Sequence, residues 1–291
     1  MFSKNNFYIK LNKYRKAMQV FSLLFLIAVP ILILLDIRYI IGNLYSISIW
    51  EIDIVDPSMV IQTIILSKEF YIPLIIAAII PIALALIFGR VFCSWMCPYN
   101  TLLELLELRS IKRIQRKLFK RKKSKNKNPR TYIYWTIFSV IIISTLLIGL
   151  PIFTWFSMPG IISSEIFAAI IGLGIGIDLL IFGIIFLSEV VLGNRYWCKY
   201  VCPVGASLSL FRTKYTMKIT YNESVCDCAA YAEPCAGNCP LNLRPKEKML
   251  YPYCFNCGRC IKVCEQTGNQ ALTFAFTDKD DKKENINNVE V

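Results

Sequence analysis

Arg90-Val-Phe-Cys93-Ser-Trp-Met-Cys97-Pro98 recurs later in the chain as Arg195-Tyr-Trp-Cys198-Lys-Tyr-Val-Cys202-Pro203. Each copy lies at the end of a long apolar stretch, Phe70–Gly89 for the first copy and Ile166–Gly193 for the second. An apolar segment that ends twice in the same cysteine motif is typical of an internal duplication. The repeat therefore predicts a fold made of two similar halves, each with this motif at the end of its second helix.

Four apolar stretches reach the roughly 20 residues that a helix needs to cross the hydrocarbon core of a bilayer. They are Ala17–Ile41, Phe70–Gly89, Thr131–Phe153 and Ile166–Gly193. The first stretch is too long for a cleavable signal peptide, and no small-residue cleavage site follows it, so we expect a retained anchor. The sequence thus predicts a membrane all-α bundle of four transmembrane helices, arranged as two repeated helix pairs, over residues 17–212.

The basic residues indicate how this bundle is oriented. Residues 1–16 carry five basic side chains and Arg109–Arg130 carries twelve, with no acid in either segment, whereas Gly42–Glu69 holds four acids and one lysine. Loops rich in lysine and arginine stay in the cytoplasm. We therefore expect a multi-pass protein of the bacterial inner membrane, with both termini and the cysteine-rich segment on the cytoplasmic side. The net charge of +13 then indicates contact with anionic lipid, and we expect no nucleic-acid partner.

The most specific cysteine pattern is Cys254-Phe-Asn-Cys257-Gly-Arg-Cys260-Ile-Lys-Val-Cys264. This C-x2-C-x2-C-x3-C spacing is typical of [4Fe–4S] clusters in bacterial ferredoxins, where one tight loop points three thiolates at three irons. Zinc is the main alternative, but zinc knuckles use two C-x2-C pairs. The pattern predicts a small, loop-rich two-cluster ferredoxin-like domain over residues 213–276, and the polar tail 277–291 is expected to be disordered.

A second set of cysteines precedes this run, as Cys226-Asp-Cys228 and Cys235-Ala-Gly-Asn-Cys239-Pro240. In two-cluster ferredoxins the fourth cysteine of each run binds the other cluster. That crossover assigns four residues to cluster 1, namely Cys226, Cys228, Cys235 and Cys264, and four to cluster 2, namely Cys239, Cys254, Cys257 and Cys260. The C-x-C spacing needs a turn at Asp227, since alternate residues of an extended chain point to opposite sides. Disulfides are the remaining alternative, which a reducing cytoplasm disfavours.

The repeated motifs bring four further cysteines. Residues at i and i+4 share a helix face, and the following proline ends or restarts the helix. The four side chains would hold a third cluster, cycle between dithiol and disulfide, bind copper(I), or pack as small apolar residues. They are Cys93, Cys97, Cys198 and Cys202.

Other residue types narrow the chemistry further. The chain has no histidine, which excludes bis-histidine haem and histidine-ligated zinc, so we expect no haem. Asp178 lies near the middle of the fourth apolar stretch and Glu189 near its cytoplasmic end. Acids inside a membrane are costly, so these two either accept protons or form hydrogen bonds within the bundle. No other catalytic residue is predicted.

These motifs together resemble the NapH/MauN family of ferredoxin-type membrane proteins. The resemblance extends from about Tyr14 to Phe276 and includes the outer-loop residues Gly42-Asn43-Leu44 and Asp56-Pro57. The segments that carry it are Gly89–Pro98, Trp197–Ala206 and Cys257-Gly-Arg-Cys260. The resemblance implies four transmembrane helices, two [4Fe–4S] clusters and electron transfer from quinol to a partner reductase chain.

Two functions are compatible with this resemblance. In the first, the protein passes electrons from quinol through the clusters to a ferredoxin-type or cytochrome c-type subunit of an anaerobic reductase of the nitrate or nitrous oxide type. It would then be a quinol dehydrogenase-type subunit rather than a stand-alone enzyme. In the second, it is a membrane iron–sulfur assembly factor that supplies electrons for maturation of a metalloenzyme. We favour the first, although fold resemblance alone does not fix function.

Overall fold

The computed structural model describes residues 7–36, 40–43, 46–50, 52–106, 129–172, 176–226, 234–247, 250–267 and 271–276. The protein is mostly helical, and it also contains two small antiparallel sheets that the sequence did not lead us to expect. Three predictions fall on residues outside the described ranges. They concern Cys228, the tail 277–291 and nearly all of the basic segment Arg109–Arg130.

The first half of the chain runs from α1 to α6. It comprises α1 (Phe7–Leu34), β1 (Ile40–Gly42), β2 (Ser46–Ile49), β3 (Ile52–Val55), α2 (Pro57–Ser67), α3 (Ile72–Ala77), α4 (Ile79–Phe88), α5 (Val91–Trp95) and α6 (Pro98–Leu106). The three strands form one sheet in the order β1-β2-β3, in the segment that the sequence analysis treated as an outer loop. The chain bends by 86° where α4 gives way to α5.

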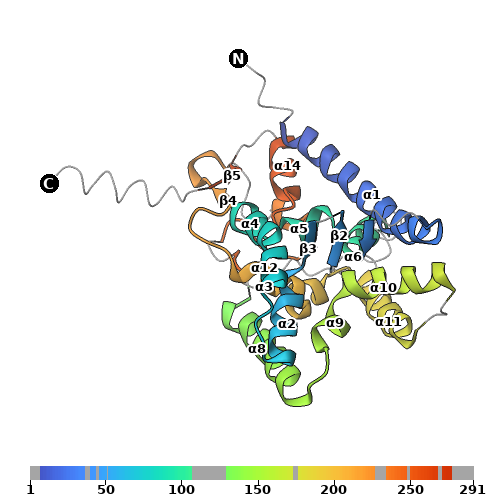
Figure 1. Cartoon of the computed structure of the whole chain (residues 1–291). Helices are drawn as coiled ribbons and strands as arrows, with labels where there is room; N and C mark the ends of the chain where they lie inside the picture. Colours follow the sequence, from blue (N-terminus) through green and yellow to red (C-terminus); the bar gives the residue numbers. More distant parts are fainter. Residues whose placement is uncertain are drawn as a thin grey trace.

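The second half repeats this order of helices. It comprises α8 (Thr131–Ile148), α9 (Ile152–Phe156), α10 (Met158–Ile171), α11 (Ile177–Leu192), a π-helical turn (Trp197–Val201) and α12 (Pro203–Leu210). In each half a long helix is followed by a shorter one, α2 or α10, and then by the helix that leads into the cysteine motif. The expected duplication is therefore visible in the succession of helices (Figure 1).

The C-terminal region has little regular structure. It contains β4 (Lys218–Tyr221), a 3-10 turn (Glu223–Val225), α13 (Pro234–Gly237), α14 (Arg259–Gln266) and β5 (Leu272–Ala275). Strands β4 and β5 pair antiparallel, so the two ends of the cysteine-rich segment meet. Figure 1 shows α14 beside the N-terminal end of α1, and these two helices are in contact.

Within the described part of the chain, two helices, α1 and α8, are long and apolar enough to cross a membrane, and the bent pair α3–α4 with α5–α6 makes a third candidate. The fourth predicted span, Ile166–Gly193, is not one helix. Helix α10 ends at Ile171, where Gly172 takes a left-handed conformation, and α11 begins only at Ile177. The glycines in Gly172-Leu-Gly-Ile-Gly176 explain the break, since glycine is a weak helix former and a common helix terminator.

This break moves Asp178 away from its expected place. The residue lies in the first turn of α11, and its side chain is exposed. An acid in the first turn of a helix is favoured by the helix dipole, so Asp178 has a simple structural explanation. The expectation of an acid near the middle of a spanning helix was wrong for this residue.

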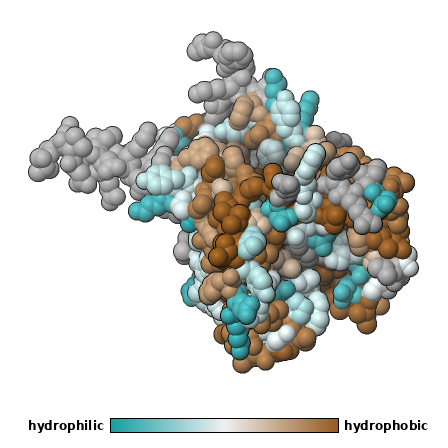
Figure 2. Space-filling model, viewed as in Figure 1, coloured by the Kyte–Doolittle hydropathy of each residue, from teal (hydrophilic) through white to brown (hydrophobic). Residues whose placement is uncertain are grey.

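The surface of the helical part is strongly apolar. Side chains such as Leu24 on α1, Leu147 on α8 and Leu180 on α11 are each more than 60% exposed. Figure 2 shows hydrophobic residues gathered over the parts of the molecule where Figure 1 places α8, α10 and α11. Exposed apolar surface of this extent is typical of a protein that faces lipid.

Helix α1 fixes the position of the first cysteine motif. Arg15 is 1% exposed and forms an ion pair of 2.6 Å with Glu104 on α6. Gln19 donates to the carbonyl of Ser94 at 2.9 Å, and Ser22 donates to the carbonyl of Met96 at 2.6 Å. Residues 1–16 were expected as a separate basic segment, but from Phe7 onward they are the first turns of α1.

Candidate iron–sulfur sites

Both copies of the motif adopt the same unusual turn. The amide of Cys97 donates to the carbonyl of Phe92, and the amide of Cys202 donates to that of Trp197, each at 3.0 Å and each over five residues. This π-type spacing differs from the simple i, i+4 helix face that the sequence predicted. The proline after the second cysteine then begins a new helix, α6 or α12, as its fixed φ and missing N–H allow.

The two turns bring the four repeated cysteines together. They line a single cavity, which we call the four-cysteine cavity, together with Arg90, Phe92, Tyr99, Asn100, Met158, Pro159, Val204 and Phe255. Cys97 and Cys202 are 6% and 8% exposed, and the other two are partly buried. The cavity therefore presents four thiols from four chain positions in a mainly apolar setting.

Each arginine of the motif crosses to the other copy. Arg195 donates to the side-chain oxygen of Asn100, and Arg90 donates to the carbonyl of Cys198 at 3.1 Å. Both arginines are 4% exposed. A Cβ atom at Gly205 would lie 2.1 Å from Arg90 Nη2, so a glycine is needed for the arginine to pass. Two buried positive charges thus lie next to the cysteine motifs, where thiolates would be stabilised.

Two shorter helices, α2 and α10, begin near the four-cysteine cavity. Met158 and Pro159, the first residues of α10, line the cavity. Met59, in the first turn of α2, packs in one apolar cluster with Cys93 and Cys202. Helix N-termini carry partial positive charge, which favours anionic groups in this place.

Glu189, one of the two acids that the sequence analysis singled out, lies beside this site. Its side chain is 4% exposed and accepts a hydrogen bond of 2.6 Å from Tyr99, which lines the cavity, and another from the amide of Trp197. The carboxylate therefore connects the first copy of the motif to the second. These hydrogen bonds fit the structural role that the sequence left open for Glu189. The proton-accepting role stays a prediction, and the place of Glu189 next to the cavity is compatible with it.

The cysteine-rich segment forms a second cavity, which we call the ferredoxin cavity. It is lined by Cys239, Cys254, Cys257 and Cys260, with seven residues that are all apolar or proline. Gly258 takes φ +69 and Asn256 takes φ +51, which gives the tight turn between the cysteines. The four thiols are the same four that the crossover assigned to cluster 2.

The remaining described cysteines also lie together. Cys235 and Cys264 belong to one buried cluster, and Cys226 packs against it. Cys260 is part of the same cluster, so it contacts this group as well as the ferredoxin cavity. The structure thus brings together three of the four residues expected for cluster 1, and the fourth, Cys228, lies outside the described residues.

The three cysteine groups follow one another through shared residues. Phe255 lines both the four-cysteine cavity and the ferredoxin cavity. Ser94 donates to the Phe255 carbonyl at 2.8 Å, and Lys199 donates to the Leu241 carbonyl at 3.0 Å. Arg90 adds a bond of 2.8 Å to the carbonyl of Pro252. The membrane motifs therefore hold the ferredoxin cavity directly against the four-cysteine cavity.

The chemistry of these thiols fits iron–sulfur clusters. Burial raises the pKa of Cys239 to about 11 and that of Cys254 to about 12, so a bound metal must displace their protons. Among the described residues, no three Cys, Asp or Glu side chains are close enough to hold a single metal ion. Four thiols around an apolar cavity are the donors that a polynuclear cluster needs.

The four-cysteine cavity also contains a donor that a cluster would satisfy. The buried side-chain nitrogen of Asn100, which lines this cavity, has no hydrogen-bond partner among the described residues. A buried N–H without an acceptor costs free energy. Cluster sulfurs and thiolates are suitable acceptors, so the residues present fit such a group.

The comparisons with known proteins agree with these sites. A family model described as a 4Fe–4S binding domain matches residues 70–126 and 175–219, the two segments that contain the repeated motif. An uncharacterized protein of Methanocaldococcus jannaschii is 31% identical over 211 residues, which are 72% of this chain and 74% of the relative.

Two named relatives are more distant. The ferredoxin-type protein NapH of Escherichia coli is 25% identical over 77% of each chain. The methylamine utilization ferredoxin-type protein MauN of Methylobacillus flagellatus is 23% identical over 77% of this chain and 66% of its own length. No solved structure matches the chain.

Proposed function

Because the chain belongs to the family of ferredoxin-type proteins that includes NapH and MauN, we propose that it carries electrons from a membrane quinol through three [4Fe–4S] clusters to a redox partner protein. The observation that carries this proposal is the row of three cysteine groups, in which neighbouring groups share Phe255 or Cys260. When bound, such clusters accept and release one electron at a time.

We propose a place for each cluster among the chain's own residues. The four-cysteine cavity holds one, with Arg90 and Arg195 as its nearby buried charges. The ferredoxin cavity holds the second. The third is held by Cys226, Cys235 and Cys264, with Cys228 as the expected fourth ligand. The match of the 4Fe–4S family model to both copies of the motif supports the first assignment over redox dithiols and copper(I).

The proposed orientation follows from the charges and the helices. Helices α1, α3–α4, α8 and α11 cross the membrane, and α2 and α10 enter it from the outer side without crossing. The termini, the basic loop and the ferredoxin cavity lie in the cytoplasm, where a ferredoxin-type or cytochrome-linked partner of an anaerobic reductase is reached. A periplasmic reporter enzyme that is active when fused after Phe276 contradicts this orientation.

The decisive experiment is anaerobic purification followed by iron analysis and EPR spectroscopy. We expect about twelve irons for each chain if three cubanes are present, and cluster signals that appear on addition of dithionite and of a quinol. Stoichiometric zinc without iron–sulfur absorption contradicts the cluster assignment. Reduction by dithionite but never by a quinol contradicts the quinol donor and favours the assembly-factor alternative.

A further inference from the structure

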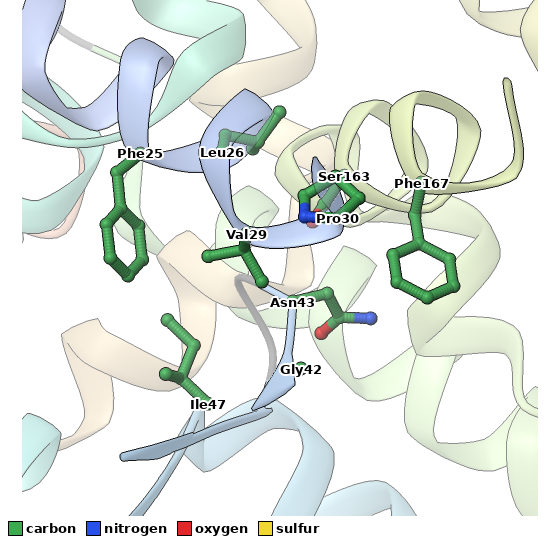
Figure 3. Close-up of a pocket in the computed structure, with 9 residues that line it drawn as sticks. All are labelled: Phe25, Leu26, Val29, Pro30, Gly42, Asn43, Ile47, Ser163 and Phe167. Carbon is green, nitrogen blue, oxygen red and sulfur yellow. The ribbon is translucent and has the colours of Figure 1, made fainter. Parts of the chain in front are cut away.

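A narrow cavity lies between α1, the β1–β2 turn and α10 (Figure 3). Figure 3 shows Phe25 and Phe167 at opposite sides of it, with Asn43 between them. The remaining lining residues are Leu26, Val29, Pro30, Gly42, Ile47 and Ser163. The neighbouring side chains of α1, including Leu24, Ile27 and Ile31, are more than 40% exposed, so the cavity lies next to lipid-facing surface.

The polar groups of this cavity are few and fixed. Ser163 is 5% exposed, and Asn43 is held in the turn by two hydrogen bonds with Ser46. Pro30 lies inside α1 and has no N–H, so the carbonyl of Leu26 lacks its usual backbone donor. Apolar and aromatic walls with a small number of polar groups are typical of small-molecule sites, here for a flat, lipid-soluble molecule with polar edges.

The cavity adjoins the first redox centre. Leu26, which lines it, packs in one buried cluster with Cys97, Met158 and Ile162. One turn earlier, Ser22 donates to the carbonyl of Met96, directly before Cys97. Side chains that include Leu26 therefore lie between this cavity and the four-cysteine cavity, so an occupant would be a neighbour of the proposed cluster.

We propose that this cavity binds the headgroup of the quinol, with its ring between Phe25 and Phe167 and its hydroxyl groups near Asn43, Ser163 and the Leu26 carbonyl. The assignment rests on the proposed function. Entry of the ring requires Phe25 and Phe167 to move apart, since the cavity is narrow. Oxidation of the quinol would break its two O–H bonds, release two protons toward the aqueous phase beyond the β1–β2 turn and leave the quinone. The four cysteines of the four-cysteine cavity would hold the cluster that takes up the two electrons, one at a time.

The test combines binding with reduction in the full-length protein in lipid nanodiscs. A photoreactive azidoquinone should label residues on α1, the β1–β2 turn or α10, and excess menadione should compete with it. Ser163→Val and Phe25→Ala should each raise the half-saturating concentration of menadiol for cluster reduction about tenfold. Ser164→Val, at an exposed neighbouring position, and Phe70→Ala, on an exposed phenylalanine outside the cavity, should leave it unchanged.

The outcomes separate this inference from the proposed function. Dithionite should reduce all variants alike, because it does not need the cavity. If menadiol reduces the wild type while Ser163→Val and Phe25→Ala match their controls, or if the label lies elsewhere, the cavity is a lipid contact and the inference is wrong. If the label maps to the cavity but menadiol never reduces the clusters, the binding site stands and the proposed electron transfer fails.

Discussion

Ser94 and Lys199 occupy the same position in the two copies of the motif, directly after the first cysteine. Ser94 donates to the carbonyl of Phe255, and Lys199 donates to the carbonyl of Leu241. Both acceptors line the ferredoxin cavity, next to Cys254 and near Cys239 respectively. The two copies therefore hold two different loops of the same cavity, and the length of each side chain suits the loop that it reaches.

The position three residues after the second cysteine also differs between the two copies. It is Asn100 in the first copy, where it accepts from Arg195, and Gly205 in the second, where it leaves room for Arg90. Arg90 continues past this glycine to the carbonyls of Pro252 and Tyr253. One arginine therefore joins the two copies to each other, and the other also joins them to the cysteine-rich segment.

These pairs explain why some positions of the repeat are identical and others are not. Both cysteines of each copy line the shared cavity, each arginine bonds to the other copy, and each proline begins the next helix, so these positions need the same chemistry on both sides. Ser94 and Lys199, which bond to different loops of the cysteine-rich segment, differ, since that segment is not duplicated. Predictions about the protein can therefore compare equivalent residues of the two copies.

The largest expected effect concerns the cysteines, where the copies should behave alike. Cys97→Ala and Cys202→Ala should each remove about four of about twelve irons and abolish quinol-driven reduction of the other clusters, because the entry site is lost. Iron analysis and EPR after addition of menadiol measure both effects. Variants that keep their iron and reduce at the wild-type rate would show that these cysteines only pack.

The next largest effect is on stability, and it should differ between the two copies of the motif. Glu104 pairs with buried Arg15 of α1, whereas the equivalent Ser209 is uncharged and its hydroxyl makes neutral hydrogen bonds, at 2.8 Å to the carbonyl of Gly205 and at 3.4 Å with Tyr134 of α8. Glu104→Gln leaves a buried charge unpaired and should lower the free energy of unfolding by about 3–5 kcal/mol. Ser209→Ala should cost about 1 kcal/mol.

Unfolding of the purified protein by denaturant, followed by circular dichroism, compares these two variants. Glu247→Gln, which breaks the partly exposed ion pair with Arg244, is the control and should cost less than about 1 kcal/mol. Equal losses for Glu104→Gln and Glu247→Gln would contradict the importance given to the buried pair.

The duplication and the thiols of the ferredoxin cavity could be predicted from the sequence, because both are marked by residues that lie close together in the chain. The repeated Arg, Cys and Pro residues predicted two similar halves, and the spacing of Cys254, Cys257 and Cys260 predicted the set of thiols that lines the ferredoxin cavity. The links between the parts were not accessible. Arg15 and Glu104 are far apart in the chain, and Ser94 and Lys199 share no chemistry that would mark them as equivalent.

The errors of the sequence analysis have equally local causes. Hydropathy alone does not register that glycines end helices, so Ile166–Gly193 was predicted as one span, and Asp178 was placed at its middle. The sheet β1–β3 and helix α2 were missed because an acidic segment between two apolar stretches was treated only as a loop. Asp56 at the N-cap and Pro57 at the first position of α2 are helix-start signals that could have predicted this helix.

A smaller effect should follow from adding a Cβ atom at Gly205, next to the guanidinium of Arg90. Gly205→Ala places a Cβ atom against the guanidinium, which three carbonyl bonds hold in a buried site, so overpacking should cost about 1–3 kcal/mol. Gly183→Ala, on α11, meets no atom within 4 Å and should be neutral or slightly stabilising. The midpoint of denaturant unfolding measures both, and equal midpoints would contradict the close contact with Arg90.

The smallest expected effect tests whether Lys199 does more than hold a loop. Its charge lies near enough to Cys239 to affect the ionisation of that thiol, whereas Ser94 brings no charge to the Cys254 side. Removing a positive charge beside an iron–sulfur centre makes addition of an electron less favourable. Lys199→Met should therefore lower the reduction potential of the cluster in the ferredoxin cavity by about 50 mV, since a tenfold change in a one-electron equilibrium is about 59 mV. Ser94→Ala removes a comparable hydrogen bond and should leave the potential nearly unchanged. An EPR-monitored redox titration compares the two, and equal potentials would mean that both side chains serve only to hold their loops.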